Sequence, residues 1–182
     1  ADRGQLMQSI TSLPLAYPVS NVVTGAPEYR LATFVLQSTA TALVFAALVL
    51  FSRSARRRRG DLTLLFLLLY GLTQAVLDST RYDSLYLRSN GFVSVVQVLS
   101  AAALVGVSAL FSARMIRCRG MRWWYVPLWL GMLALLGGAG YMEYFVQRHG
   151  DRALFSYTNM TIFLSAFTGL SLMTYGAAVK ST

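Results

Sequence analysis

The sequence predicts an all-α membrane protein, a polytopic bundle of five transmembrane helices. Its 182 residues are 55% hydrophobic and only 13% charged, about half the ~25% charged residues that are usual in soluble domains. A helix needs about 20 mostly apolar residues to cross a bilayer. Only helices and closed barrels satisfy all their backbone hydrogen bonds in lipid. The predicted spans are residues 32–51, 62–80, 91–113, 123–146 and 153–179.

Four of these windows are long and nearly free of charge, because Glu143 near the end of the fourth span is their only charged side chain. The window at 62–77 is uncharged and rich in Leu but has only 16 residues, so Asp78, Ser79 and Thr80 are needed to extend it. A buried or re-entrant helix is the alternative there, and it would leave four spans. We expect the glycines in these windows, Gly71 among them, to allow close helix packing.

Arginine placement predicts the topology. The loops after the first and third spans, residues 52–61 and 114–122, hold nine arginines and one acid, Asp61. Positive charge is typical of cytoplasmic loops, so the N-terminal segment 1–31 is expected outside and the C-terminus in the cytoplasm. The arginines of the two cytoplasmic loops then account for the net charge of +9, and nucleic acid is not an expected partner.

Most catalytic chemistries find no support in the sequence. Cys118 and His149 are the only cysteine and the only histidine, so no Cys/His metal site is expected. No Gly-rich phosphate loop of the P-loop kind occurs, and no inverted repeat suggests a transporter. We therefore expect neither a metal nor a cofactor.

The informative residues are the polar ones inside the apolar windows. Thr33, Gln37 and Thr41 recur every four residues in the first span and share one helical face. In the second span and just beyond it a similar stripe runs toward the predicted outer end, and the third span begins with a further pair. The residues of that stripe and pair are Tyr70, Gln74, Asp78 and Arg81, followed by Ser94 and Gln97.

By the predicted topology, these side chains, with Glu143 in the fourth span and Asn159 and Thr161 in the fifth, are expected toward the same side of the membrane. Hydrogen bonding between helices, together with anchoring at the interface, is one interpretation. The other is a polar cavity that opens to the outer leaflet and holds a lipid head group, because polar groups inside a bilayer face the bundle interior or a water-filled cavity.

A longer pattern of residues resembles a known family. The run Tyr70-Gly71-Leu72, followed by Gln74, Asp78, Arg81 and Asp83, resembles the signature of prolipoprotein diacylglyceryl transferase. Gly91, Gln97 and Ser100 then occupy the places of the family's Gly, Gln and Ser in the next helix. Residues 30–38 resemble a degenerate form of the family segment that leads into an earlier span. The resemblance covers about residues 12–113 and implies a divergent member or the C-terminal portion of one.

The chain also departs from the family pattern. Gln74 stands where the family has an arginine, Asp78 where it has a glutamate, and Gln37 replaces the glutamate of the entry segment. The family's N-terminal half has no counterpart here, and the two spans from Trp123 onward go beyond the usual pattern.

The resemblance implies transfer of a diacylglyceryl group from phosphatidylglycerol to the lipobox cysteine of a preprolipoprotein, in the plasma (inner) membrane of a bacterium. It implies Arg81 and Asp78 as catalytic residues. Substrate contacts are expected from Tyr70, Gln74, Gln37 and Gln97. The expected partners are phosphatidylglycerol or another anionic lipid and a lipobox-containing preprolipoprotein. The alternative is a non-catalytic lipid-binding or assembly protein that kept the fold.

Overall fold

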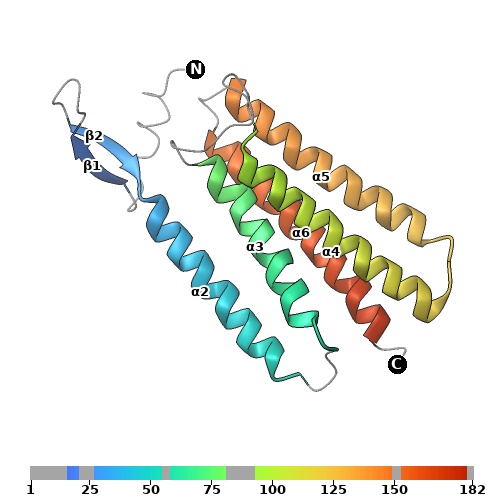
Figure 1. Cartoon of the computed structure of the whole chain (residues 1–182). Coiled ribbons are helices and arrows are strands. Elements are labelled where there is room, and N and C mark those ends of the chain that lie inside the picture. Colours follow the sequence, from blue (N-terminus) through green and yellow to red (C-terminus); the bar gives the residue numbers. More distant parts are fainter. Residues whose placement is uncertain (1–15, 21–26, 55–57, 81–92, 149–152, 180–182) are drawn as a thin grey trace.

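The computed structural model of the chain describes residues 16–20, 27–54, 58–80, 93–148 and 153–179, and Figure 1 shows a bundle of antiparallel helices. Within these ranges five helices are long and apolar enough to cross a membrane. They are α2 (Thr33–Ser52), α3 (Asp61–Ser79), α4 (Val95–Arg119), α5 (Tyr125–Arg148) and α6 (Ala153–Val179). The predicted fold class, an all-α membrane bundle of five helices, is confirmed, and the short window at 62–77 is a full helix.

A short β-hairpin precedes α2, which the sequence did not predict. Strand β1 (Ala16–Ser20) pairs antiparallel with β2 (Pro27–Leu31), with Tyr17 opposite Arg30. The hairpin lies at the N-terminal end of α2 (Figure 1). We call this end of the bundle the hairpin end, and the opposite end, where α3 begins and α4 ends, the arginine end.

Local chemistry sets the ends of α4, which differ from the predicted span 91–113. Ser94 and Gln97 form a capping box, in which the Ser94 hydroxyl accepts from the Gln97 backbone N–H and the Gln97 side chain accepts from the Ser94 N–H. This arrangement satisfies backbone donors that have no partner inside the helix. The helix therefore begins at Val95. It continues to Arg119 and ends at Gly120, whose φ of 72° suits a residue without a Cβ.

Four helices make the body of the bundle. Helix α4 packs against α3 and α6, and α6 packs against α5. Their shared apolar core includes Leu68, Leu104, Phe111 and Phe167. Helix α2 lies at the edge, packs against α3 and buries Val44, so most of its surface is left for lipid or for other partners.

Gly71 allows α3 and α4 to approach closely, as expected from the sequence. A Cβ at this position would lie 3.1 Å from the backbone oxygen of Ser100 and 3.3 Å from Cγ of Leu104. We predict that Gly71→Ala lowers the free energy of unfolding in bilayer discs by about 1–3 kcal/mol, since overpacking forces neighbouring groups to shift. Gly106→Ala is the matched control, because a Cβ there meets nothing within 4 Å. Equal stability of the two variants would contradict this packing.

Candidate functional site

The carboxylate of Asp78 lies buried at the hairpin end. It belongs to the last turn of α3, and the side chain of Ser94 donates a hydrogen bond to its Oδ2. Ser94 is itself held in place, because its Oγ accepts from the Gln97 N–H at 3.0 Å and its own N–H donates to Gln97 Oε1 at 2.9 Å. The capping box of α4 therefore presents one hydroxyl to Asp78.

A second buried carboxylate, Glu143 of α5, lies at the same end. The hydroxyl of Ser79 donates to Glu143 Oε2 at 2.5 Å. The hydroxyl of Tyr157, in the second turn of α6, donates to the backbone oxygen of Ser79 at 3.1 Å. Asp78 and Glu143 are only 5% and 6% exposed. We call Asp78, Ser79, Ser94, Gln97, Glu143 and Tyr157 the Asp78 cluster; it joins four helices.

The cluster is assembled by the up-and-down course of the chain. Figure 1 places the last turn of α3, the first turn of α4, the last turns of α5 and the first turns of α6 at the hairpin end. Ionisable side chains inside a membrane are costly, and they usually mark a site that binds, transports or reacts. Two buried carboxylates with hydroxyl partners can accept hydrogen bonds from a polyol or orient a cationic side chain.

The predicted site residues divide into four groups, the last of which is Gln37 alone. Gln74, Asp78 and Gln97 are buried in the bundle. The side-chain oxygen of Gln97 already accepts a hydrogen bond from the backbone N–H of Ser94. Tyr70 lies at the margin of the same helical face, 42% exposed, and its ring stacks on Phe66 with the centroids 5.3 Å apart. Arg81 lies outside the described residues, so its pairing with Asp78 stays a prediction.

Gln37, the remaining predicted site residue, lines a groove along α2. The groove is shallow and open, and Gln37, Ser38 and Thr41 give it a polar strip between two phenylalanines. Its lining is Phe34, Gln37, Ser38, Thr41, Ala42 and Phe45. The groove thus offers hydrogen-bonding groups and aromatic surface side by side on the half of α2 nearer the hairpin.

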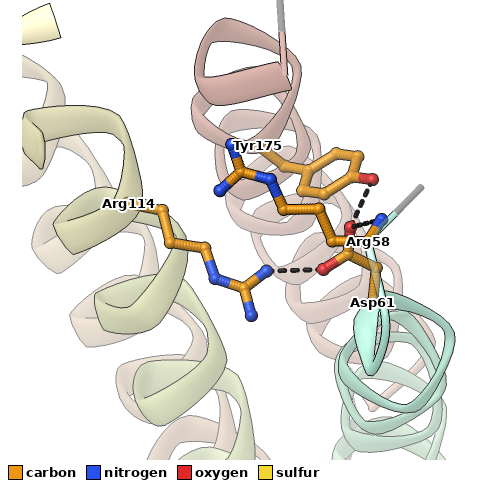
Figure 2. Close-up of polar contacts among 4 residues, drawn as sticks. All are labelled: Arg58, Asp61, Arg114 and Tyr175. Atoms are coloured by element: carbon orange, nitrogen blue, oxygen red, sulfur yellow. Dashed lines mark hydrogen bonds and ion pairs between the residues drawn. The ribbon is translucent and has the colours of Figure 1, made fainter. Parts of the chain in front are cut away.

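Sequence reasoning missed a second polar cluster, which lies at the arginine end. Figure 2 shows the fully buried Asp61, the first residue of α3, between α4 and α6. Arg114 Nη1 of α4 donates to Asp61 Oδ1 at 2.5 Å, and the hydroxyl of Tyr175 in α6 donates to Oδ2 at 2.8 Å. The Arg58 backbone N–H donates to the same oxygen at 2.8 Å. Asp61 was recognisable only as the lone acid in two arginine-rich loops.

The two clusters differ in what they can do. Both oxygens of Asp61 are engaged by groups of the protein itself. The ion pair joins α3 to α4 and the Tyr175 hydrogen bond joins α3 to α6, which indicates a structural role. Within the described ranges, no group of three or more His, Cys, Asp or Glu side chains could hold a metal ion. The Asp78 cluster brings two buried carboxylates from different helices to one end of the bundle, and we take it as the candidate site.

Comparison with known proteins shows the family of the chain. The family model "Prolipoprotein diacylglyceryl transferase" matches residues 4–112, a segment that contains the hairpin, α2, α3 and most of α4, and with them Gln37, Gln74, Asp78 and Gln97. Helices α5 and α6 lie outside the match. Searches of curated proteins and of solved structures give no significant match. Because the family model covers more than half of the chain, the chain belongs to the prolipoprotein diacylglyceryl transferase family.

Proposed function

We propose that this protein transfers a diacylglyceryl group from phosphatidylglycerol to the lipobox cysteine thiol of a preprolipoprotein. Membership of the family supports this proposal. The observation that carries it is the buried carboxylate of Asp78, which lies inside the matched segment and is held by Ser94. A buried acid at the position where the family has a glutamate is costly in a bilayer, and a site that uses it explains its presence.

The transfer forms one bond and breaks one. The cysteine sulfur bonds to the glyceryl carbon, and the bond between that carbon and the phosphate oxygen breaks. Glycerol phosphate leaves with the electron pair, and the thiol proton ends on the leaving group or in water. Negative charge grows on the departing phosphate, so a cation aimed at it lowers the barrier. We assign this role to Arg81, because an arginine fork matches two phosphate oxygens.

The neighbouring polar residues would then bind the rest of the lipid. Asp78, fixed by Ser94, orients Arg81 or accepts a hydrogen bond from a hydroxyl of the glycerol head group. Gln97 uses its oxygen in the capping box, which leaves its amide nitrogen to donate to a ligand. Gln74 and Tyr70 lie one and two turns before Asp78, and we assign contacts with the glycerol backbone to Gln37, beside the aromatic surface of the open groove on α2.

The orientation follows from the charges. The arginine end holds Arg58 and Arg59 before α3 and Arg114, Arg117 and Arg119 in the last turns of α4. We propose that this end faces the cytoplasm and that the Asp78 cluster faces the outer side of a bacterial plasma membrane, where lipoprotein precursors emerge.

A non-catalytic function is the second candidate, and one residue favours it. Gln74 stands where the family has an arginine, and an amide can donate hydrogen bonds to a phosphate but cannot neutralise it. A protein that binds the lipid and assists a partner would tolerate this change.

A transfer assay separates the two functions. The purified chain in phosphatidylglycerol vesicles is incubated with a lipobox peptide, and the peptide mass and released glycerol phosphate are measured. The proposal expects a diacylglyceryl adduct and equimolar glycerol phosphate, and neither product in vesicles of phosphatidylcholine. Saturable binding of phosphatidylglycerol without either product would replace the transferase with the lipid-binding function.

A further inference from the structure

Two side chains of the Asp78 cluster come from helices that the family model does not cover. Glu143 belongs to α5 and Tyr157 to α6, whereas the match ends at residue 112. Both side chains nevertheless bond to the same residue of the matched segment, Ser79. The C-terminal helix pair is therefore connected to the candidate site itself.

The two bonds hold Ser79 by different groups. Glu143 accepts from its hydroxyl, and Tyr157 donates to its carbonyl oxygen. The last carbonyls of a helix lack partners inside the helix, and a helix end without external partners frays. Ser79 is the last residue of α3 and directly follows Asp78. The bonds therefore fix the turn that carries Asp78.

The other contacts of this helix pair show that a carboxylate is unnecessary for packing alone. Nearer the arginine end, α5 reaches α4 through a neutral bond, in which Trp129 Nε1 donates to Ser112 Oγ at 3.2 Å. Helix α6 meets α4 through the hydroxyls of Ser108 and Ser171, 2.6 Å apart. A buried acid where α5 meets the end of α3 therefore needs a reason beyond helix association.

We propose that α5 and α6 complete the transfer site, and that Glu143 and Tyr157 are positioning residues that hold the Asp78-bearing end of α3. This inference rests on the proposed function for its kinetic consequence, but its structural consequence is independent of catalysis. Neither residue needs to touch the lipid; each acts through Ser79.

Hydrogen exchange of the full chain in lipid discs tests the structural consequence. Glu143→Leu removes the acceptor, and amides of residues 76–80 should then exchange about tenfold faster, as expected for losing one buried hydrogen bond. Glu143→Gln keeps an acceptor oxygen and should retain protection. Ser112→Ala is the matched control, because it breaks the α4–α5 bond at Trp129 far from Ser79. Unchanged exchange at 76–80 in Glu143→Leu would overturn the inference, whether or not the chain is a transferase.

A double-mutant cycle in the transfer assay tests the kinetic consequence, with rates normalised to folded protein. Glu143→Leu and Ser79→Ala should each lower kcat about tenfold and change KM for phosphatidylglycerol less than twofold. The double variant should be no slower than either single one, because Glu143 acts through Ser79.

Two further variants extend the test. Tyr157→Phe should also lower kcat and leave KM nearly unchanged, and the kcat of Glu143→Gln should stay within about threefold of that of the parent. Additive losses, or a full loss in Glu143→Gln, would overturn the positioning role. If the parent shows no transfer, the proposed function fails and the exchange result still decides this inference.

Discussion

Arg114→Ala is expected to lower the free energy of unfolding by about 3 kcal/mol, at the lower end of the range for breaking a buried ion pair. The substitution leaves the carboxylate of Asp61, which is fully buried, without its cationic partner. The Tyr175 hydroxyl and the Arg58 N–H still donate to Asp61, and Arg114 is itself 29% exposed. These features keep the loss below the upper end of the range. Reversible unfolding of the purified chain in bicelles measures the difference.

Arg117→Ala provides the control. Arg117 lies three residues further along α4 and is exposed, so its removal should change the free energy of unfolding by no more than about 0.5 kcal/mol. Asp61→Asn should cost less than Arg114→Ala, because it removes the buried charge and leaves the partly exposed arginine to be solvated. If Arg114→Ala and Arg117→Ala are equally stable, the ion pair at the arginine end does not hold the bundle together.

Arg81→Ala is expected to lower the rate of diacylglyceryl transfer about a hundredfold or more. That loss is typical when one preorganised donor to the developing anion is removed. Arg81→Lys keeps the charge but loses the two-pronged geometry, and its rate should lie between those of the parent and Arg81→Ala. The assay is the formation of the lipidated peptide, normalised to the folded yield of each variant.

Arg88→Ala is the matched control for Arg81→Ala. It removes one positive charge from the same predicted loop, residues 81–90, and leaves the residues of the family pattern unchanged. Its transfer rate should stay close to that of the parent. Equal losses in both variants would mean that general positive charge near the membrane surface, and not a placed arginine, supports the reaction.

The bundle was predictable because each span is encoded locally. About 20 apolar residues in a row are sufficient to specify a crossing helix, and loops with charged residues separate the spans. The burial of Gln74 and Asp78 followed from their spacing of four residues on an otherwise apolar helix. Gly71 likewise marked the close approach of α3 and α4, which a side chain would prevent.

The contacts that the sequence did not reveal join residues far apart in the chain. Nothing near Tyr157 indicates that it bonds to Ser79, and nothing near Tyr175 indicates Asp61, because tertiary packing alone brings them together. The exposure of Tyr70 shows the limit of spacing arguments. A step of four residues turns a helix by 40° more than a full circle. Tyr70, Gln74 and Asp78 therefore point in successively different directions. Helix α4 covers the side of α3 that carries Gln74 and Asp78, and Tyr70 lies outside it.

Binding of phosphatidylglycerol by Gln74→Arg and by Arg81→Ala tests most directly whether the Asp78 cluster is an anionic-lipid site. Arginine at position 74 lies one turn from Asp78 and restores the cation that the family pattern has there. The account therefore predicts tighter binding to vesicles for Gln74→Arg and weaker binding for Arg81→Ala, each by about tenfold, or about 1.4 kcal/mol. Phosphatidylcholine vesicles should show neither change. If both well-folded variants bind phosphatidylglycerol as the parent does, the lipid site does not lie at this end of α3.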